Sequence, residues 1–208
     1  MRALIMPTDI FNVVELRAVT RVMKKRGWEY DIRALKSEII AEDKSLKVKL
    51  SGVISEIKDV GPYDLVLATS GEPTRKWALC EDINARRLIA EQHNRNKWVG
   101  SICATVPILK DIANGARVTC YNSYDVMEVL QAAGAILEMR SILVDLDKKI
   151  VTAQAPPMAE MWVEVCCDCV EGKDTGGIWL SQFEYKQNMG YYHKVSGPGP
   201  LHTRVGKK

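Results

Sequence analysis

The sequence is short of the features that mark several large classes of protein. Its 208 residues include three histidines and two phenylalanines, and no apolar run approaches the roughly 20 residues of a membrane span. The net charge of +3, from 29 basic and 26 acidic residues, is too small to indicate binding to nucleic acid or to a membrane surface. No Gly-x-Gly-x-x-Gly sequence or phosphate loop is present. We therefore expect no nucleic acid, membrane or nucleotide among its partners.

The first residues do not resemble a secretory signal. Met1-Arg2 is followed by only a short apolar run, residues 3–6, before Pro7. This run is too brief for the apolar region of a signal peptide. We expect a cytoplasmic protein, in which the six cysteines are thiols.

Three of these cysteines form the run Cys166-Cys167-Asp168-Cys169, which admits two interpretations. A zinc site usually needs a second pair of ligands at suitable spacing, and the sequence offers none. On a helix, Cys166 and Cys169 would lie on the same side as Trp162. This spacing favours a place in the core, so we predict that they pack inward and that the protein has no metal site and no cofactor.

The chain alternates short apolar runs with amphipathic stretches, which is typical of a parallel sheet covered by helices on both faces. The fold class is therefore predicted to be α/β, with three layers. The expected strands span residues 3–6, 28–32, 47–50, 64–68, 98–102, 117–121, 142–145 and 150–152. The expected helices span residues 12–26, 79–95, 104–114, 125–133 and 158–170, with Ile83, Leu88 and Ile89 facing inward in the second of them.

The sequence changes character near residue 172. Residues 1–172 form the predicted α/β domain, and residues 173–208 form an extension that contains Phe183, Tyr185, Tyr191 and Tyr192. Large aromatic side chains are costly to leave in water. We therefore expect the extension to pack on the domain or on a partner subunit.

The segment around Cys103 carries the clearest chemical signal. A buried strand ends directly at Cys103, and small or β-branched residues follow before a helix, as in a nucleophile elbow. There the side chain would stand exposed above the carboxyl edge of the sheet, the helix N-terminus would lower the thiol pKa, and the amide of Ala104 would face an oxyanion. The alternative is that Cys103 is a small apolar residue closing a strand. The local pattern leaves both interpretations open.

Four segments, in order, resemble the ThiJ/PfpI superfamily, which includes the Parkinson's-disease-associated deglycase. They are Arg2-Ala-Leu-Ile-Met with Glu15; Gly61-Pro-Tyr-Asp-Leu-Val-Leu; Glu91-Gln-His-Asn-Arg with Ile102-Cys103-Ala104; and Val118-Thr119 through Ile150-Val-Thr-Ala-Gln-Ala-Pro156. The resemblance covers about residues 1–172. It implies a flavodoxin-like or amidotransferase-like fold, Cys103 as the nucleophile, and a homodimer.

The resemblance also implies roles for other residues. In this family a glutamate from the first helix hydrogen-bonds to the reactive cysteine, and Glu15 falls at the matching position. Glu15 is either a solvent-exposed charge or, because it interrupts an apolar face, a buried carboxyl kept protonated by desolvation. The family has paired glycines after the third strand. Only Gly71 remains here, so its amide would help Ala104 to hold an oxyanion, with Glu72 projecting toward the site.

Many members of this family carry a histidine beside the cysteine or on the next strand. Those places hold Ala104 and Tyr121 here. Tyr121 is therefore either a replacement proton donor or an aromatic wall of the pocket. His93 is expected at the surface, and His193 and His202 lie in the extension. We expect the extension to cover the mouth of the site and to bring His193 to it.

Two functions are compatible with these features. The first is a cofactor-independent hydrolase or lyase of the glyoxalase, deglycase or amidase type. In it Cys103 attacks a small carbonyl, amide or adduct substrate, and Glu15 moves the proton. The second is a non-enzymatic oxidative-stress sensor or chaperone that uses oxidation of Cys103. The aromatic extension favours the enzyme, because such a segment can close a pocket over a small-molecule substrate.

Overall fold

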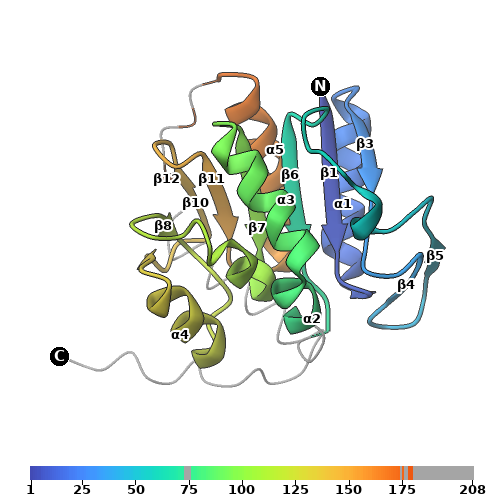
Figure 1. Ribbon diagram of the computed structural model, residues 1–208, viewed down its shortest axis with the longest axis horizontal. Coiled ribbons are helices and arrows are strands. Elements are labelled where there is room, and N and C mark those ends of the chain that lie inside the picture. Colours follow the sequence, from blue (N-terminus) through green and yellow to red (C-terminus); the bar gives the residue numbers. More distant parts are fainter. Residues whose placement is uncertain (73–75, 174, 176–177, 180–208) are drawn as a thin grey trace.

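The computed structural model describes residues 1–72, 76–173, 175 and 178–179. A seven-stranded sheet forms its centre (Figure 1). Its strands, from one edge to the other, are β12 (Ile178–Trp179), β10 (Ile142–Asp145), β11 (Ile150–Ala153), β7 (Trp98–Ile102), β6 (Leu65–Thr69), β1 (Arg2–Pro7) and β3 (Glu29–Ile32). Neighbouring strands from β11 to β3 pair in parallel, and β10 is antiparallel to both β11 and β12. The predicted α/β class is confirmed, and the two strands predicted at residues 142–145 and 150–152 form an antiparallel pair.

Helices cover both faces of this sheet, which gives three layers. Figure 1 shows α1 (Val13–Lys25) and α5 (Ala159–Val170) behind the sheet and α3 (Ile83–Asn94) in front of it. The front layer also holds α2 (Lys76–Glu81), the 3-10 helix η2 (Cys103–Leu109) and α4 (Tyr124–Ala132). Both α2 and α4 pack against η2. Because both faces are covered, the central strands are apolar along their length, and all five residues of β6 are buried.

Two small sheets and two further 3-10 turns complete the described chain. β2 (Ile10–Phe11), β4 (Glu38–Ala41) and β5 (Lys47–Lys49) form one sheet, and β8 (Arg117–Val118) pairs with β9 (Ile136–Leu137) in the other. The 3-10 turns are η1 (Ile54–Glu56) and η3 (Pro156–Met158). An isolated antiparallel bridge joins Phe11 of β2 to Gly71. It ties the loop before α1 to the loop after β6.

The first helix begins and ends where local chemistry predicts. The Asn12 side chain accepts hydrogen bonds from the amides of Val14 and Glu15, as an N-cap residue does. At the other end, Gly27 has a φ of 70°, a conformation that glycine adopts without strain. Leu16, Val19 and Met23 are buried on one face, as the helical spacing predicts.

The helix expected over residues 79–95 is in fact two helices, α2 and α3. Asp82 separates them because its carboxylate caps α3 by accepting the amide of Ala85 at 2.8 Å. Leu88 and Ile89 face inward as predicted. The same prediction for Ile83 is wrong: it lies in the first turn of α3 and is 78% exposed.

Two other elements are shorter than predicted. The helix expected over residues 104–114 is the 3-10 helix η2, which ends at Leu109 and contains Pro107. The strand expected over residues 117–121 is limited to β8, because side-chain hydrogen bonds take over at Thr119. Its amide donates to Thr152 Oγ1 at 2.9 Å, and its hydroxyl donates to the Arg140 carbonyl at 2.6 Å.

The cysteines of α5 lie in the core, as predicted. Cys166, Cys167 and Cys169 are buried, and Trp162 beside them donates its indole N–H to the Val151 carbonyl at 3.1 Å. All six cysteines of the chain are buried and free.

The predicted extension is described only at residues 173, 175 and 178–179. There β12 pairs with β10 and adds an edge strand to the main sheet. Phe183, Tyr185, Tyr191, Tyr192, His193 and His202 lie outside the described residues. Among the described residues, no helix has the length and apolar character needed to cross a membrane.

Candidate active site

Cys103 occupies a strained turn at the end of the central strand β7. Its φ is +61°, in the left-handed region that residues with a side chain adopt at a cost of about 1–2 kcal/mol. The strand stops at Ile102, and η2 starts at Cys103 itself. This geometry confirms the sharp strand-to-helix turn. The expected exposure is wrong, because Cys103 is only 4% exposed.

The register of the sheet brings the loop after β6 alongside Cys103. Ala68 of β6 pairs with Ser101 of β7, so Ser70 and Cys103 each lie two residues further toward the same edge. Ser70 is buried, and its side chain hydrogen-bonds to the Cys103 thiol. This loop therefore supplies the polar wall of the site.

Glu15 comes to the same place from the first turn of α1. It is fully buried, and both of its oxygens accept hydrogen bonds from Ser70: the amide donates to Oε2 at 2.5 Å and the hydroxyl to Oε1 at 2.8 Å. Burial raises the pKa of Glu15 to about 8, although the Ser70 bonds favour the charged form. Of the two interpretations of Glu15, the exposed charge is excluded, and the raised pKa agrees with a buried carboxyl that keeps its proton near neutral pH.

The thiol itself is not activated in the way that the sequence predicts. Burial raises the pKa of Cys103 well above its ordinary value, and the nearby Glu15 and Glu42 raise it further. The hydrogen bonds that the sulfur makes with the Ser70 side chain and the Ala104 amide oppose this effect. The expected lowering by a helix N-terminus is therefore wrong. η2 is short, and desolvation of a buried thiolate outweighs its influence.

Gly71 is held too tightly for any other residue. A Cβ atom there would lie 1.7 Å from the Ile10 carbonyl oxygen and 2.4 Å from Thr8 Oγ1. The bridge to β2 uses the amides of Asn12, which donates to Ser70 O at 2.9 Å, and of Glu72, which donates to Ile10 O at 3.0 Å. The Gly71 amide takes no part in either of these bonds. Its expected role in holding an oxyanion stays a prediction.

Two further acidic residues act on the charges of the site. Glu42 accepts a hydrogen bond from Asn12 Nδ2 at 2.9 Å, and its pKa is raised by burial and by the charge of Glu72. Glu42 in turn raises the pKa values of both Glu15 and Cys103. The charge of Glu72 thus acts on Glu42, and the charge of Glu42 acts on both Glu15 and Cys103.

Tyr121 contacts Cys103 through the backbone. Its amide donates to the Cys103 carbonyl at 3.2 Å, and its half-buried phenol has a pKa raised by burial and by Cys103. Tyr121 is therefore beside the thiol, as predicted. His93 is half-buried rather than at the surface, and its pKa is lowered by burial and by the charge of Lys148.

Sequence reasoning missed Ser70, Glu42 and Asn12. Asn12 has a local signal, since an asparagine before an amphipathic helix is a typical N-cap. Ser70 and Glu42 have none, because the sheet register and the turn after β4 bring them to the site. In the part of the chain that the structure describes, no group of three His, Cys, Asp or Glu residues could hold a metal ion.

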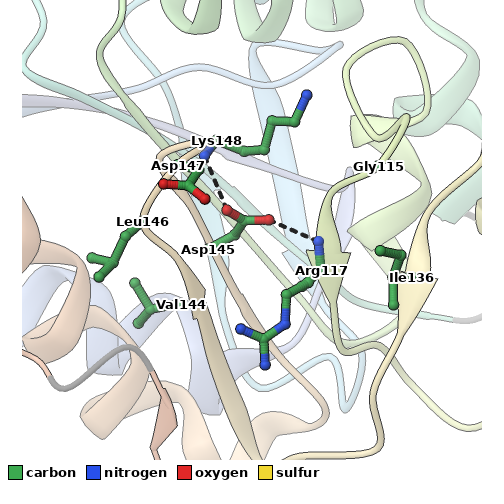
Figure 2. Close-up of a pocket in the computed structure, with 8 residues that line it drawn as sticks. All are labelled: Gly115, Arg117, Ile136, Val144, Asp145, Leu146, Asp147 and Lys148. Atoms are coloured by element: carbon green, nitrogen blue, oxygen red, sulfur yellow. Dashed lines mark hydrogen bonds between the residues drawn. The ribbon is translucent and has the colours of Figure 1, made fainter.

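Two surface cavities lie at opposite ends of the sheet. One, of about 320 Å³, is lined by Gly115, Arg117, Ile136 and residues 144–148 (Figure 2). Figure 2 shows that Asp145 accepts hydrogen bonds from the backbone amides of Arg117 and Lys148, which are 2.8 and 3.0 Å long. This carboxylate therefore links the turn between β10 and β11 to β8. Asp145 pairs with the first residue of β11, at the edge of the sheet away from Cys103.

The other cavity, of about 280 Å³, lies at the Cys103 edge of the sheet. It is lined by Asp9 and Ile10, which lie between β1 and α1, by Leu35 and Lys36 from beyond β3, and by Ala78 and Leu79 of α2. Parallel sheets bind ligands at this edge. The cavity offers room for a small molecule next to the loop that holds Gly71.

Comparison with known proteins agrees with this arrangement. Residues 1–168 match the model of the DJ-1/PfpI family. The chain is 30% identical over 140 residues to an uncharacterised protein of Methanocaldococcus jannaschii. The aligned region covers 64% of this chain and 67% of that protein.

Solved structures share the fold at lower identity. A ThiJ/PfpI domain protein from Brachyspira murdochii superposes with a TM-score of 0.74 and 16% identity, covering 83% of this chain and 98% of the other. Schizosaccharomyces pombe DJ-1 superposes with a TM-score of 0.71 and 16% identity, covering 95% of this chain and 100% of the other. Drosophila melanogaster DJ-1beta superposes with a TM-score of 0.70 and 14% identity, covering 93% of this chain and 96% of the other.

Proposed function

Because the chain belongs to the DJ-1/PfpI family, we propose that it is a cofactor-independent cysteine enzyme acting on a small carbonyl, amide or adduct substrate. The observation that carries the proposal is the φ of +61° at Cys103. A glycine would occupy this turn without strain, so a side chain held there at a cost points to chemistry that needs the thiol. The buried carboxyl of Glu15 in the same cluster provides the proton-handling group that such chemistry needs.

The step common to these reactions is addition of the thiol to an electrophilic carbon. The Cys103 sulfur forms a bond to the carbonyl carbon, the C=O π bond breaks, and the proton that leaves the thiol ends on the former carbonyl oxygen. Glu15 is the shuttle for this proton. Its pKa of about 8 lets both its protonated and its ionised form be populated near neutral pH. Hydrolase and lyase reactions differ only in how the resulting adduct breaks down.

The raised pKa and burial of Cys103 favour an enzyme over a redox sensor. Sensor cysteines are low-pKa, accessible thiols that oxidise readily. Cys103 is 4% exposed and its pKa is raised well above the ordinary value. Such a thiol reacts well only when a bound substrate and a neighbouring base help to remove its proton.

Turnover of 2-oxoaldehydes, their amine adducts and small amides tests the proposal. We expect Cys103→Ser and Glu15→Gln to lose turnover while remaining folded, and Cys120→Ser, which alters another buried thiol, to keep it. Turnover that survives in Cys103→Ser would contradict the site. A wild-type protein that turns over none of these compounds, but whose Cys103 is oxidised first by dilute peroxide, would support the sensor instead.

A further inference from the structure

Ser70 links the two reactive groups of the site. Its hydroxyl donates to Glu15 Oε1 at 2.8 Å, and the same side chain hydrogen-bonds to the Cys103 thiol. A hydroxyl has one proton to donate and two lone pairs that accept. It can therefore receive a proton from one neighbour while passing its own to the other.

The sheet register and a backbone hydrogen bond both fix the position of Ser70. The sheet register places it level with Cys103. Its backbone amide, which donates to Glu15 Oε2 at 2.5 Å, holds the carboxyl in place independently of the hydroxyl. Ser70 is 2% exposed, so water does not freely compete for these bonds. In the described chain, both hydrogen bonds to the Glu15 carboxyl come from this one residue.

We propose that Ser70 is a proton-relay residue that carries the thiol proton of Cys103 to Glu15. The catalytic meaning of this relay rests on the proposed function. Ser70-Gly71 stands where the ThiJ/PfpI pattern has paired glycines, so the hydroxyl is a feature of this chain's own sequence. In the family pattern the carboxyl hydrogen-bonds to the thiol, and here Ser70 hydrogen-bonds to both of these groups.

The relay step is balanced as follows. With Glu15 in its carboxylate form, the S–H bond of Cys103 breaks and its proton goes to Ser70 Oγ. The O–H bond of Ser70 breaks and that proton goes to Glu15 Oε1. The sulfur lone pair forms the new bond to the electrophile. Glu15 then holds the proton that is later delivered to the substrate oxygen, and nothing is oxidised or reduced.

This mechanism makes the reactivity of Cys103 depend on the ionisation of Glu15. Other titratable groups face the pair. Glu42 acts on both Glu15 and Cys103, Glu72 acts on Glu42, and Tyr121 lies beside the thiol. The pH dependence assigned to Glu15 must therefore be separated from theirs with matched variants.

Alkylation of Cys103 by iodoacetamide, followed by peptide mass spectrometry between about pH 6 and 10, tests the relay without a substrate. We expect the wild-type rate to rise with an inflection near pH 8, where Glu15 ionises. Ser70→Ala keeps the hydrogen bond from the backbone amide to Glu15 but should lose the inflection, and Glu15→Gln should lose it as well. It should also react roughly tenfold more slowly at about pH 8, as expected for loss of one hydrogen bond to the reacting atom.

Two controls accompany this measurement. Ser141→Ala removes another buried serine hydroxyl, immediately before β10, and should leave the profile unchanged. Glu42→Gln should keep the inflection and move it to lower pH, because one repulsive charge is removed. If Ser70→Ala retains the wild-type inflection, or reacts faster at every pH, the proton does not pass through Ser70 and the proposal is wrong.

The relay and the proposed function can fail separately. Alkylation reports on the proton path even if Cys103 catalyses no reaction. Conversely, loss of turnover in Cys103→Ser, together with an unchanged profile in Ser70→Ala, would leave the enzyme assignment standing and reject only the relay.

Discussion

Ser70 binds both oxygens of the Glu15 carboxyl group, one through its backbone amide and the other through its hydroxyl. Two donors of this kind usually hold the pKa of a carboxyl low. Here complete burial outweighs them and the pKa is raised to about 8. The site therefore stores a proton that the unfolded chain would release in mildly acidic solution.

The stability of the fold should decrease with pH because of this proton. The folded pKa of Glu15 is about 8 and its ordinary value is 4.5, so the folded state binds the proton more tightly between these values. The stabilisation is fully present below about pH 4.5 and is lost as pH rises to about 8. We expect the free energy of unfolding to fall by a few kcal/mol across this window.

Glu15→Gln isolates this contribution, because the amide is neutral at every pH. Urea unfolding of both proteins at about pH 5, 7 and 9 measures it. The variant should gain stability relative to wild type as pH rises. A difference between the two proteins that stays constant over this range would show that Glu15 is not protonated in the folded state.

Gly71→Ala should destabilise the protein through a backbone clash. The new Cβ would lie 1.7 Å from the Ile10 carbonyl oxygen, which cannot move without breaking its bond to the Glu72 amide. We expect a loss of about 1–3 kcal/mol or more.

The matched control for this clash is Gly115→Ala. Gly115 has a φ of 70° but nothing within 4 Å of its Cβ position, so it should lose only the cost of a left-handed alanine, about 1 kcal/mol. Thermal or urea unfolding compares the two variants. Equal losses would mean that the loop after β6 relaxes freely, which would contradict a rigid site.

Lys76 and Asp125 form an ion pair that joins α2 to α4, the two helices that pack against η2. The ammonium is 2.7 Å from the Asp125 carboxylate, and the lysine side chain is 5% exposed whereas the aspartate is 50% exposed. Asp125→Asn leaves a buried ammonium without its charged partner. We expect a loss of about 2–3 kcal/mol, below the roughly 3–5 kcal/mol of a fully buried pair.

Lys76→Met provides the comparison, because it removes the charge and keeps most of the packing. It should cost less than Asp125→Asn. Urea unfolding of the two single variants decides the order. If Lys76→Met is the more destabilising, the pair is a net stabilising bond rather than a buried charge that must be neutralised.

Tyr121→Phe should reduce turnover by about a hundredfold or more if the phenol donates a proton to the developing oxyanion. Its raised pKa keeps the phenol protonated near neutral pH, and it lies beside Cys103. We expect a lower kcat with little change in KM. Tyr124→Phe is the control, since that ring is 77% exposed. Full activity of Tyr121→Phe would reduce Tyr121 to an aromatic wall of the pocket.

Much of the architecture could be predicted because it depends on local pattern. Strands covered on both faces must be apolar along their whole length, so β1, β6 and β7 are visible as runs. Two of the errors in element bounds occur where side chains form hydrogen bonds with the backbone. Asp82 divides one expected helix into two by capping the second, and Thr119 ends a strand early through its side-chain bonds.

The sequence by itself singled out Cys103 and Glu15 as residues that could carry the chemistry. A strand that ends at Cys103 and a helix that opens with Glu15 are local facts, and Asn12 and Gly27 set the bounds of that helix. Only the tertiary structure decided what state these groups adopt. Burial of Cys103 raises its pKa where the local pattern predicted the opposite. The register of β6 against β7 brings Ser70 level with Cys103, and Ser70 also binds the Glu15 carboxyl. Desolvation and strand register both depend on residues distant in the chain, which no local window contains.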